Sequence, residues 1–304
     1  MSEKALVEEK VRQLYPGEPV KVLVEGGMSF ACETGGNIIR VPKNEYAAIG
    51  YRIEEKILAH LAGKIKSADI PGIKIVEKPF FHTIHKKLEG LYWDGAAYIC
   101  KPEKERDLLA NDCAVFLTEV HAADIKKINA ELSKANIKMR ELQSKEEIEE
   151  HIKNYLYRDF SVNEIDKIIK FITPLYDLPE EDKCLIHNDF YYDNFFVDNN
   201  LRLKGVIDFA NSGHYNYNFD FRKIVSYEEG EQDLWERIVK FYERLTNRKI
   251  DMQVIKIIDI YNYISFLTYF AKNPEISEEK IGVRDNWDSY VEHIKHNIKE
   301  YADA

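Results

Sequence analysis

Residues 185–209 constrain this chain more than any other stretch, because they place charged side chains between short apolar runs. The segment reads LIHNDFYYDNFFVDNNLRLKGVIDF. Asp189 and Asn194 flank an aromatic loop, and Asp208 follows the apolar run 205–207. A carboxylate at the end of a buried strand is costly unless a positive charge meets it. The pattern therefore predicts that Asp208 faces a cation or a metal ion.

A magnesium ion fits this set of side chains. Mg²⁺ prefers carboxylate and amide oxygens together with phosphate oxygens, so Asn194 and Asp208 are the predicted metal ligands. Asp189 is then free to orient an acceptor hydroxyl and to accept its proton. Phosphoryl transfer needs such positioned charges and little covalent chemistry from the protein. We therefore expect phosphoryl transfer with Asp189 as the catalytic residue; the competing interpretation is an ordinary acidic surface turn.

The spacing HxDxxxxN at 187–194, followed by IDF at 207–209, resembles the catalytic loop and metal site of the aminoglycoside phosphotransferases, which have a protein-kinase-like fold. Within that family the chain is most similar in appearance to the 2''-aminoglycoside phosphotransferases. The resemblance implies an α+β, two-lobed fold. It places a small antiparallel-sheet lobe with the nucleotide site and hinge at 1–90, and a larger, mainly helical lobe with the catalytic loop and acceptor site at 91–304.

Hydrophobic periodicity agrees with a sheet-rich N-terminal part. Alternating residues predict strands at 19–25, 28–33 and 38–42, with a hairpin turn at 34–37, because Gly and Asn tolerate positive φ. Two further apolar runs, at 73–76 and 80–84, are also expected to be strands.

Helices are expected at 3–14, 45–63 and 105–122, and mainly helical structure at 128–176 and 231–304. The second and third carry inward-facing apolar stripes: Ile49, Ile53, Ile57, Leu58 and Leu61, and then Leu109, Cys113, Phe116, Leu117 and Val120.

The resemblance also implies a nucleotide site. The segment Gly26-Gly27-Met28-Ser29 is similar to the family's nucleotide-covering loop, where backbone N–H groups and the Ser29 hydroxyl approach phosphates. Arg40 stands where kinases carry a lysine, and its guanidinium can grip phosphate oxygens. Lys43 is the rival, since alternating side chains cannot both face one cleft.

Two further nucleotide contacts follow from the same resemblance. Glu54 matches the helix glutamate that pairs with the strand cation, and Glu55 is its alternative. The hinge corresponds to HKKLEG at 85–90, where His85 and Lys87 lie beside the base of ATP or GTP. The backbone of a hinge contacts the base, so the choice between the two nucleotides stays open.

Three polar residues are expected to hold the catalytic loop rather than to touch substrate. His121, on an apolar helix face, is interpreted as structural in preference to catalytic. His187 is expected to hydrogen-bond the loop backbone, and Asp220, which matches the acidic residue at the start of the family's next helix, to brace the loop.

A cationic acceptor needs carboxylates near the catalytic aspartate. An acidic segment resembles the stretch at the same place in the 2''-aminoglycoside phosphotransferases, and a tryptophan resembles a patch near the family's C-terminus. Together with Asp189 these give the predicted acceptor residues Glu228, Glu229, Glu231, Asp233 and Trp287. The alternative interpretation of the acidic segment is a solvated helix start, where acidic residues favour the helix dipole.

The leading functional hypothesis is thus Mg²⁺-dependent phosphorylation of an aminoglycoside antibiotic hydroxyl, which implies antibiotic resistance. Residues 209–219 lack the family's usual Gly-Asp and Asp-Pro steps, Arg40 replaces lysine, and 191–193 are bulkier than usual. These differences keep two alternatives open. One is a kinase for a choline-like, sugar or macrolide hydroxyl, and the other is a nucleotide-binding pseudoenzyme.

Composition agrees with a cationic small-molecule partner. The net charge is −10, from 43 Lys+Arg and 53 Asp+Glu, which argues against nucleic acid and anionic membranes as partners. The four cysteines are not spaced as metal or redox pairs, and reduced thiols are expected. The longest apolar stretch, 254–271, is broken by Lys256 and Asp259. A cytoplasmic enzyme is therefore expected.

Overall fold

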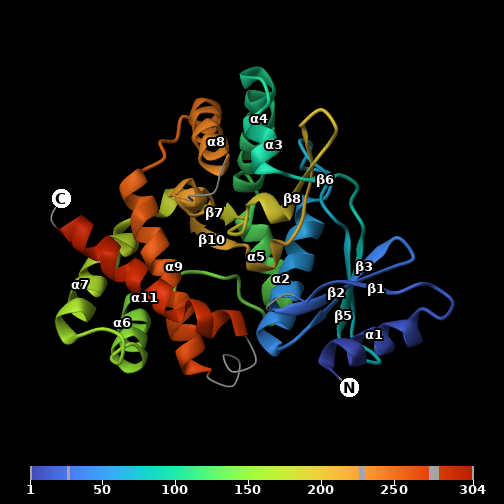
Figure 1. The fold of residues 1–304 in the computed structure, drawn as a ribbon, viewed down its shortest axis with the longest axis horizontal. Helices are drawn as coiled ribbons and strands as arrows, with labels where there is room; N and C mark the ends of the chain where they lie inside the picture. The colour runs from blue at the N-terminus through green and yellow to red at the C-terminus, as the bar shows by residue number, and fades with distance from the viewer. Residues whose placement is uncertain (1, 26–27, 226–229, 274–280, 303–304) are drawn as a thin grey trace. The chain divides into compact units, whose positions relative to one another are not determined.

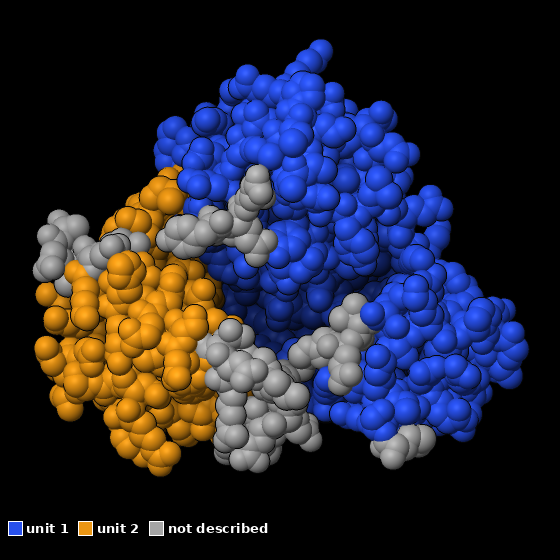
Figure 2. Space-filling view, in the orientation of Figure 1, with its two compact units in different colours: residues 1–140, 183–249 blue, residues 141–182, 250–304 orange. Residues whose placement is uncertain are grey.

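The computed structural model describes residues 2–25, 28–225, 230–273 and 281–302 (Figure 1). The chain divides into two compact units, coloured blue and orange in Figure 2. Unit 1 comprises Met1–Arg140 and Lys183–Lys249, and unit 2 comprises Glu141–Asp182 and Ile250–Ala304. Each unit is a part of the chain whose residues contact mainly one another. The lobe boundary at residue 90 was predicted from a family resemblance instead, and it stays a prediction.

A five-stranded sheet forms the N-terminal part of unit 1. Its order is β1-β2-β3-β5-β4, and every neighbouring pair is antiparallel. The expected hairpin turn is confirmed, since Gly35 and Gly36 have φ of 53° and 73° between β2 and β3. The strands are β1 (Lys21–Glu25), β2 (Ser29–Thr34), β3 (Asn37–Pro42), β4 (Ile73–Val76) and β5 (His82–Lys86).

The two faces of this sheet carry different residues. Ile39 and Val41 of β3, with Phe30 and Cys32 of β2, pack on α1 (Glu3–Leu14) in an apolar core. Arg40 points to the opposite face, which it shares with its register partner Thr83 on β5. Side chains alternate along a strand, so the sheet separates an apolar core from a polar face.

Helix α2 (Glu45–Leu61) follows β3 and presents Ile53, Ile57, Leu58 and Leu61 to the interior, as expected. Ile49 differs from the expectation, because its side chain is 39% exposed near the start of the helix. The strand expected at 80–84 begins two residues later. Phe80 lies in the preceding loop and packs onto the apolar core from there, so the apolar run and the strand are offset by two residues.

The rest of unit 1 is helical around two small sheets. Helix α4 (Glu103–His121) buries all the apolar residues predicted to face inward, from Leu109 to Val120, and packs against α8 (Glu231–Thr246). The remaining elements are α3 (Gly95–Ile99), α5 (Ile125–Lys134), β6 (Leu91–Tyr92), β7 (Lys183–Ile186), β8 (Phe195–Val197), β9 (Leu203–Val206), β10 (Gly213–Asn216), and the 3₁₀ turns η3 (Tyr192–Asn194), η4 (Phe209–Asn211) and η5 (Tyr217–Val225).

The hairpin of β8 and β9 brings the distant parts of the sequence motif together. Phe195 pairs with Val206 in antiparallel register, and the Ile207 N–H donates to the carbonyl of Asn194 (2.9 Å). Asp69, in the loop between α2 and β4, forms a parallel bridge to Gly205. The five-stranded sheet and the motif hairpin are therefore tied together within unit 1, whose surface in Figure 2 is hollowed between its sheet-bearing and helical parts.

In the described residues, unit 2 consists of helices α6 (Lys145–Tyr155), α7 (Val162–Ile172), α9 (Met252–Lys272) and α11 (Ile281–Ala302), with turns η1 (Thr173–Asp177) and η2 (Glu180–Asp182). Both α6 and α7 begin with a serine capping box, at Ser144 and Ser161. Helix α9 is long and apolar enough to cross a membrane, but 56% of its most apolar window is buried within the protein. That burial is typical of a core helix.

Candidate active site

Three charged side chains from distant parts of the sequence meet on the polar face of the sheet. Arg40 on β3 donates from Nη1 to Glu54 Oε2 (3.3 Å) and from Nη2 to Asp208 Oδ1 (3.0 Å). Its guanidinium also lies over the Tyr51 ring, 4.5 Å from the centroid. Glu54 is completely buried on α2, and its Oε1 accepts from the Phe209 N–H (3.1 Å). The helix glutamate is thus linked to both the strand cation and the backbone after Asp208.

The two alternatives left open by the sequence lie elsewhere. Lys43 places its ammonium over the Phe30 ring, 4.4 Å from the centroid, and Glu55 pairs with Lys56 (3.0 Å). The geometry therefore favours Arg40 and Glu54 as the pair beside Asp208, as the strand alternation and family pattern suggested. Their contact with a nucleotide stays a prediction.

Asp208 has an unusual backbone conformation. Its φ and ψ are 68° and 64°, in the left-handed region, which costs a non-glycine residue of order 1 kcal/mol or more. Burial alone would raise the pKa of Asp208, but the charge and hydrogen bond of Arg40 outweigh it and hold that pKa below its ordinary value. Asp208 is therefore kept as a carboxylate, and 30% of its side chain remains exposed.

The predicted metal ligands have suitable oxygen atoms. The Nδ2 of Asn194 donates to the backbone carbonyl of Asp189 (2.9 Å), which leaves Oδ1 to accept. One amide oxygen and one carboxylate form a donor set that suits Mg²⁺ when phosphate oxygens and water complete its shell. Within the described part of the chain, three or more His, Cys, Asp or Glu side chains nowhere gather to hold a metal by themselves. The residues thus fit a magnesium ion that binds together with a nucleotide.

Asp189, the candidate base, lies in the loop between β7 and η3. Burial raises its pKa, against the opposing charge of Arg222. Its Oδ1 lies 3.6 Å from Arg222 Nη2, and its Oδ2 accepts from Asn211 Nδ2 (3.5 Å). A raised pKa makes a carboxylate a better proton acceptor near neutral pH.

A buried brace holds this loop from below. Asp220 in η5 accepts from the backbone N–H groups of Asn188 (2.6 Å) and His187 (2.9 Å), and its Oδ2 contacts His121 Nε2 (2.9 Å). His121 also contacts the Tyr242 hydroxyl through Nδ1 (2.7 Å). The carboxylate of Asp220 is completely enclosed. These contacts agree with the structural roles expected of His121 and Asp220.

His187 also holds the loop by backbone hydrogen bonds. Its Nε2 donates to the carbonyl of Ile207 (3.1 Å), and its Nδ1 accepts from the N–H of Asp189 (3.2 Å). Burial lowers the pKa of His187, which agrees with a neutral ring that donates at one nitrogen and accepts at the other. One buried ring thereby links the candidate base to the strand that ends before Asp208.

The other predicted nucleotide residues occupy different environments. Ser29 begins β2, and residues 26–27 of the predicted covering loop lie outside the described residues. His85 is buried at the end of β5, where its Nε2 contacts the Thr83 hydroxyl (2.8 Å), and burial lowers its pKa to about 3. Lys87 is exposed and pairs with Glu33 (2.6 Å). Their roles stay predictions.

Phe196 was missed by sequence reasoning. It lies on the face of β8 opposite the buried Phe195 and Val197, and its ring lies 5.1 Å from that of the exposed Tyr92. A Cβ added to Gly90, in the hinge segment, would lie 2.6 Å from the Phe196 Cβ. The sequence signal that could have found it is the alternation of side chains along the strand after Asn194, which turns Phe196 away from its two buried neighbours. Phe196 thus lies beside the predicted hinge segment and carries an apolar ring there.

The predicted acceptor residues are only partly described. Glu228 and Glu229 lie outside the described residues. Glu231 is buried at the start of α8. Asp233 already contacts Arg106 (2.8 Å), Arg237 (2.8 Å) and the Tyr98 hydroxyl (3.0 Å). Trp287 lies on α11, in unit 2. Their acceptor roles stay predictions.

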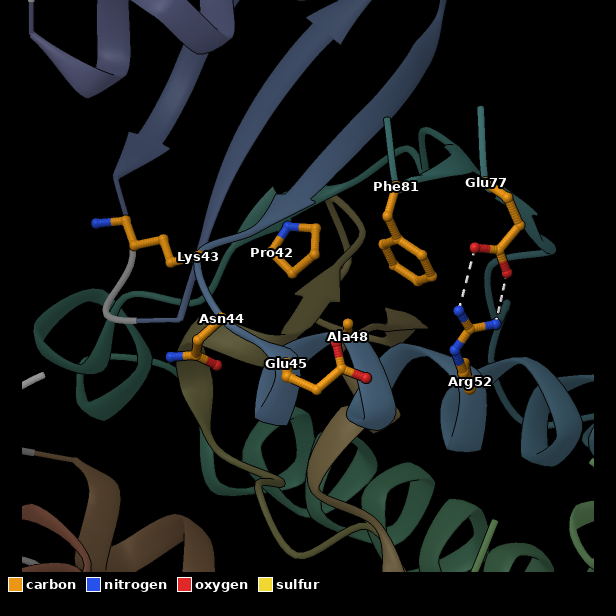
Figure 3. A pocket seen from close by; sticks show the side chains of 8 residues that line it. All are labelled: Pro42, Lys43, Asn44, Glu45, Ala48, Arg52, Glu77 and Phe81. Carbon is orange, nitrogen blue, oxygen red and sulfur yellow. Dashed lines mark hydrogen bonds and ion pairs between the residues drawn. The ribbon is translucent and has the colours of Figure 1, made fainter. Parts of the chain in front are cut away.

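A separate pocket of about 350 Å³ lies where β3 meets α2 (Figure 3). Arg52 and Glu77 form a two-bonded ion pair on one wall, and the Arg52 guanidinium lies over the Phe81 ring at 4.8 Å. Pro42, Lys43, Asn44, Glu45 and Ala48 line the rest. The pocket does not include Arg40, Glu54, Asp189 or Asp208, so it is not the catalytic centre predicted from the motif.

Solved structures with the same fold include aminoglycoside and macrolide phosphotransferases. Aminoglycoside phosphotransferase APH(2'')-Ib with ADP is 23% identical, with a TM-score of 0.74 and coverage of 96% of this chain and 97% of that chain. The complex of APH(2'')-IIIa with GDP and kanamycin is 17% identical, with a TM-score of 0.70 and coverage of 97% of both chains. A macrolide 2'-phosphotransferase type I is 16% identical, with a TM-score of 0.64 and coverage of 98% of both chains.

The structural similarity over nearly the whole chain establishes the fold, and it confirms the predicted α+β kinase-like class with a small antiparallel sheet and a larger helical part. A match to a family model identifies the family as well as the fold. The model described as the phosphotransferase enzyme family matches residues 29–258, which include every element that carries the Arg40, Asp189 and Asp208 side chains. Because this match covers well over half of the sequence, the chain belongs to the phosphotransferase enzyme family and is a phosphotransferase.

Proposed function

We propose that this phosphotransferase transfers the γ-phosphate of ATP or GTP to a hydroxyl of a cationic small molecule, with an aminoglycoside as the favoured acceptor. The observation that carries the proposal is the meeting of Arg40, Glu54 and Asp208 beside the loop that holds Asp189 and Asn194. Aminoglycoside phosphotransferases with this fold, bound to ADP or to GDP and kanamycin, support the choice of donor and acceptor.

The donor is held by residues of different chemistry. Arg40 supplies a guanidinium that can move from Asp208 to phosphate oxygens, while Glu54 keeps it on the polar face of the sheet. Asp208 and Asn194 would hold Mg²⁺, which when bound neutralises phosphate charge. Phe196 and the hinge at 85–90 would receive the base. Only backbone groups of the hinge need to contact the base, which is why both nucleotides remain in the proposal.

The acceptor hydroxyl is expected to bind next to the Asp189 carboxylate. The oxygen of the acceptor hydroxyl forms a bond to the γ-phosphorus as the bond between that phosphorus and the bridging oxygen of the leaving diphosphate breaks. The hydroxyl proton passes to the Asp189 carboxylate. Burial raises the pKa of this carboxylate and so makes it a better proton acceptor. Of the predicted acceptor residues, Glu228, Glu229, Glu231 and Trp287 are proposed to attract the ammonium groups and rings of the acceptor, whereas Asp233 already contacts Arg106 and Arg237 and is expected to contribute little. The proposed location of the enzyme is the cytoplasm, where both donor nucleotides are abundant, and its proposed consequence is antibiotic resistance.

A panel of acceptors with both nucleotides tests the proposal. We expect Mg²⁺-dependent formation of nucleoside diphosphate with one or more aminoglycosides and a phosphorylated product in the mass spectrum. The Asp189→Ala variant should lose about 10³-fold in kcat while its nucleotide affinity is kept, because it removes only the proton acceptor.

Other outcomes of the panel reject parts of the proposal. Turnover of a macrolide, a sugar or a choline-like alcohol without turnover of any aminoglycoside would reject the acceptor and keep the chemistry. The same fold in a macrolide phosphotransferase makes this a needed arm of the panel. Thermal stabilisation by Mg²⁺ and nucleotide without any phosphorylated product would reject catalysis and indicate a nucleotide-binding pseudoenzyme.

A further inference from the structure

We propose that Arg222 is a positioning residue that fixes the orientation of the Asp189 carboxylate, an inference that rests on the proposed phosphoryl transfer. Arg222 lies in η5, two residues after the brace residue Asp220. Its Nη1 donates to the Asn188 Oδ1 (3.0 Å) and toward the Phe219 carbonyl (3.4 Å), and its Nη2 lies 3.6 Å from Asp189 Oδ1. One guanidinium thereby contacts two successive residues of the catalytic loop.

The Asp189 carboxylate is held from both sides. Arg222 approaches Oδ1, and Asn211 donates to Oδ2 from the separate turn η4. The last torsion of an aspartate side chain is broad and intrinsically poorly fixed, so external donors decide which way the oxygens point. Proton transfer and attack require the reacting atoms in a narrow geometry. The two donors supply that geometry before a substrate arrives.

An arginine suits this position better than a lysine. Its planar fork can meet an amide oxygen and a carboxylate oxygen at once, whereas an ammonium acts as a single point charge. Arg222 is itself mostly buried, with 18% of its side chain exposed, and it lies two residues after Asp220, which accepts from the backbone N–H groups of His187 and Asn188. Arg222 thus connects the rigid brace under the loop to the carboxylate at its tip.

The charge of Arg222 has a second consequence for a cationic acceptor. A permanent positive charge next to the candidate base repels ammonium groups that approach the same carboxylate. Loss of Arg222 therefore has two effects of opposite direction on catalysis. It lowers kcat, because Asp189 loses its orientation, and it lowers the KM of a polycationic acceptor, because a repulsive charge is gone. A purely structural contribution would lower kcat together with thermal stability and would not improve the KM.

Steady-state kinetics of Arg222→Gln, Arg222→Lys and Lys223→Gln separates these roles. Lys223 is the matched control, since it is the neighbouring cation and lies over the Tyr191 ring at 4.8 Å from the centroid. We expect Arg222→Gln to lower kcat by about tenfold or more and to lower the acceptor KM several-fold, at unchanged melting temperature. Arg222→Lys should keep the wild-type KM and regain part of kcat. Lys223→Gln should keep kcat within about twofold.

A crystallographic readout tests the positioning without turnover. We expect one conformer of the Asp189 carboxylate in the wild-type protein and more than one in Arg222→Gln. If the wild type phosphorylates no acceptor, the proposed function fails, and the conformers still decide the role of Arg222. A single, unchanged Asp189 conformer in Arg222→Gln overturns the inference. So does an unchanged kcat, or a fall in kcat that a lower melting temperature accounts for.

Discussion

Two aspartates of unit 1, Asp208 and Asp220, show how differently one side chain can be used. Asp220 is completely enclosed, and its two oxygens accept from three donors of the protein: two backbone N–H groups and His121. Asp208 keeps 30% of its side chain exposed and accepts from Arg40 on Oδ1 and from the backbone N–H of Ala210. A carboxylate offers about four acceptor positions, so Asp220 is nearly used up by the fold while Asp208 has capacity for a ligand.

The difference teaches that the role of a motif carboxylate depends on how many of its acceptor positions the protein leaves open, as well as on its place in the sequence. Both residues lie in turns, η5 for Asp220 and the N-terminal end of η4 for Asp208. Asp208 also carries left-handed backbone torsions, a strain that is common where geometry serves binding. Asp208 is therefore expected to matter for the ligand, and Asp220 for the fold.

The largest expected effect on ligand binding follows from Asp208→Asn. Asparagine has nearly the same size and tolerates left-handed torsions, so the backbone is kept and only the charge is lost. We expect Mg²⁺-dependent nucleotide affinity to fall by about 100-fold or more, because a hard divalent ion loses its one proposed carboxylate ligand. Isothermal titration with nucleotide in the presence and absence of Mg²⁺ measures this.

The stability of the same variant is the control. Asp208 is partly exposed and Arg40 keeps Glu54 as a partner, so the free energy of unfolding should change by at most about 1 kcal/mol. Nucleotide affinity that is equal to wild type with Mg²⁺ present would remove Asp208 from the metal site.

The next effect is on stability, and Asp220→Asn produces it. Asparagine cannot accept at both positions from three donors, so the loop brace is broken. We expect the free energy of unfolding at pH 7 to fall by about 3 kcal/mol, because the buried carboxylate that accepts three hydrogen bonds is replaced and buried donors lose their partner. Denaturant unfolding measures it, with retained nucleotide affinity in the surviving folded protein as the contrast to Asp208→Asn.

The pH dependence gives the brace a signature of its own. Burial alone would raise the pKa of Asp220, but the hydrogen bond and charge of His121 and the N–H of His187 outweigh it, so the pKa is lowered. The unfolded chain then binds more protons in acid, and stability falls as the pH drops below the ordinary value of about 3.9 for aspartate. Asp220→Asn should therefore lose less stability than the wild type between about pH 5 and pH 2. A parallel loss in both proteins would contradict this assignment.

Sequence patterns predicted those parts of the molecule that depend on local spacing. The hairpin between β2 and β3 follows from Gly35 and Gly36, and the buried stripe of α4 follows from its helical periodicity. The motif also named Asp208 as a metal ligand, and the family pattern named Arg40 as a phosphate contact paired with Glu54, but the ion pair between Arg40 and Asp208 was not predicted. These residues are 168 positions apart, and their contact depends on the β8–β9 hairpin and the five-stranded sheet.

Contacts made between separate turns could not be predicted in this way. Arg222 reaches Asp189 and Asn188 only because η5 folds back on the catalytic loop, and no spacing rule relates residues so far apart. The acidic segment shows a different limit. Sequence composition cannot tell an acidic side chain that awaits a ligand from one that already contacts two arginines, as Asp233 does.

A smaller effect is expected from Glu54→Gln. This change acts on the Asp208 site indirectly, because Glu54 holds Arg40, which contacts Asp208. Burial raises the pKa of Glu54, against the opposing charge of Arg40. Glutamine keeps an oxygen for the Phe209 N–H but loses the charge that holds Arg40. We expect nucleotide affinity to fall by about tenfold, the size of one charge-assisted hydrogen bond. Glu55→Gln is the matched control and should leave affinity unchanged, because Glu55 pairs with Lys56.

The smallest effect is expected from Asp233→Asn, and it decides whether this carboxylate resembles Asp208 or Asp220. Asp233 is 27% exposed on α8, where it contacts Arg106 of α4 and the Tyr98 hydroxyl of α3. Burial alone would raise its pKa, but hydrogen bonds from Arg237 and Tyr98 lower it. Such a partly exposed network contributes about 1 kcal/mol or less. A carboxylate that already neutralises two guanidinium groups has little left for an acceptor, so the acceptor KM should stay within about twofold. A tenfold rise in KM at unchanged stability would show instead that Asp233 leaves its arginines to bind the cationic acceptor.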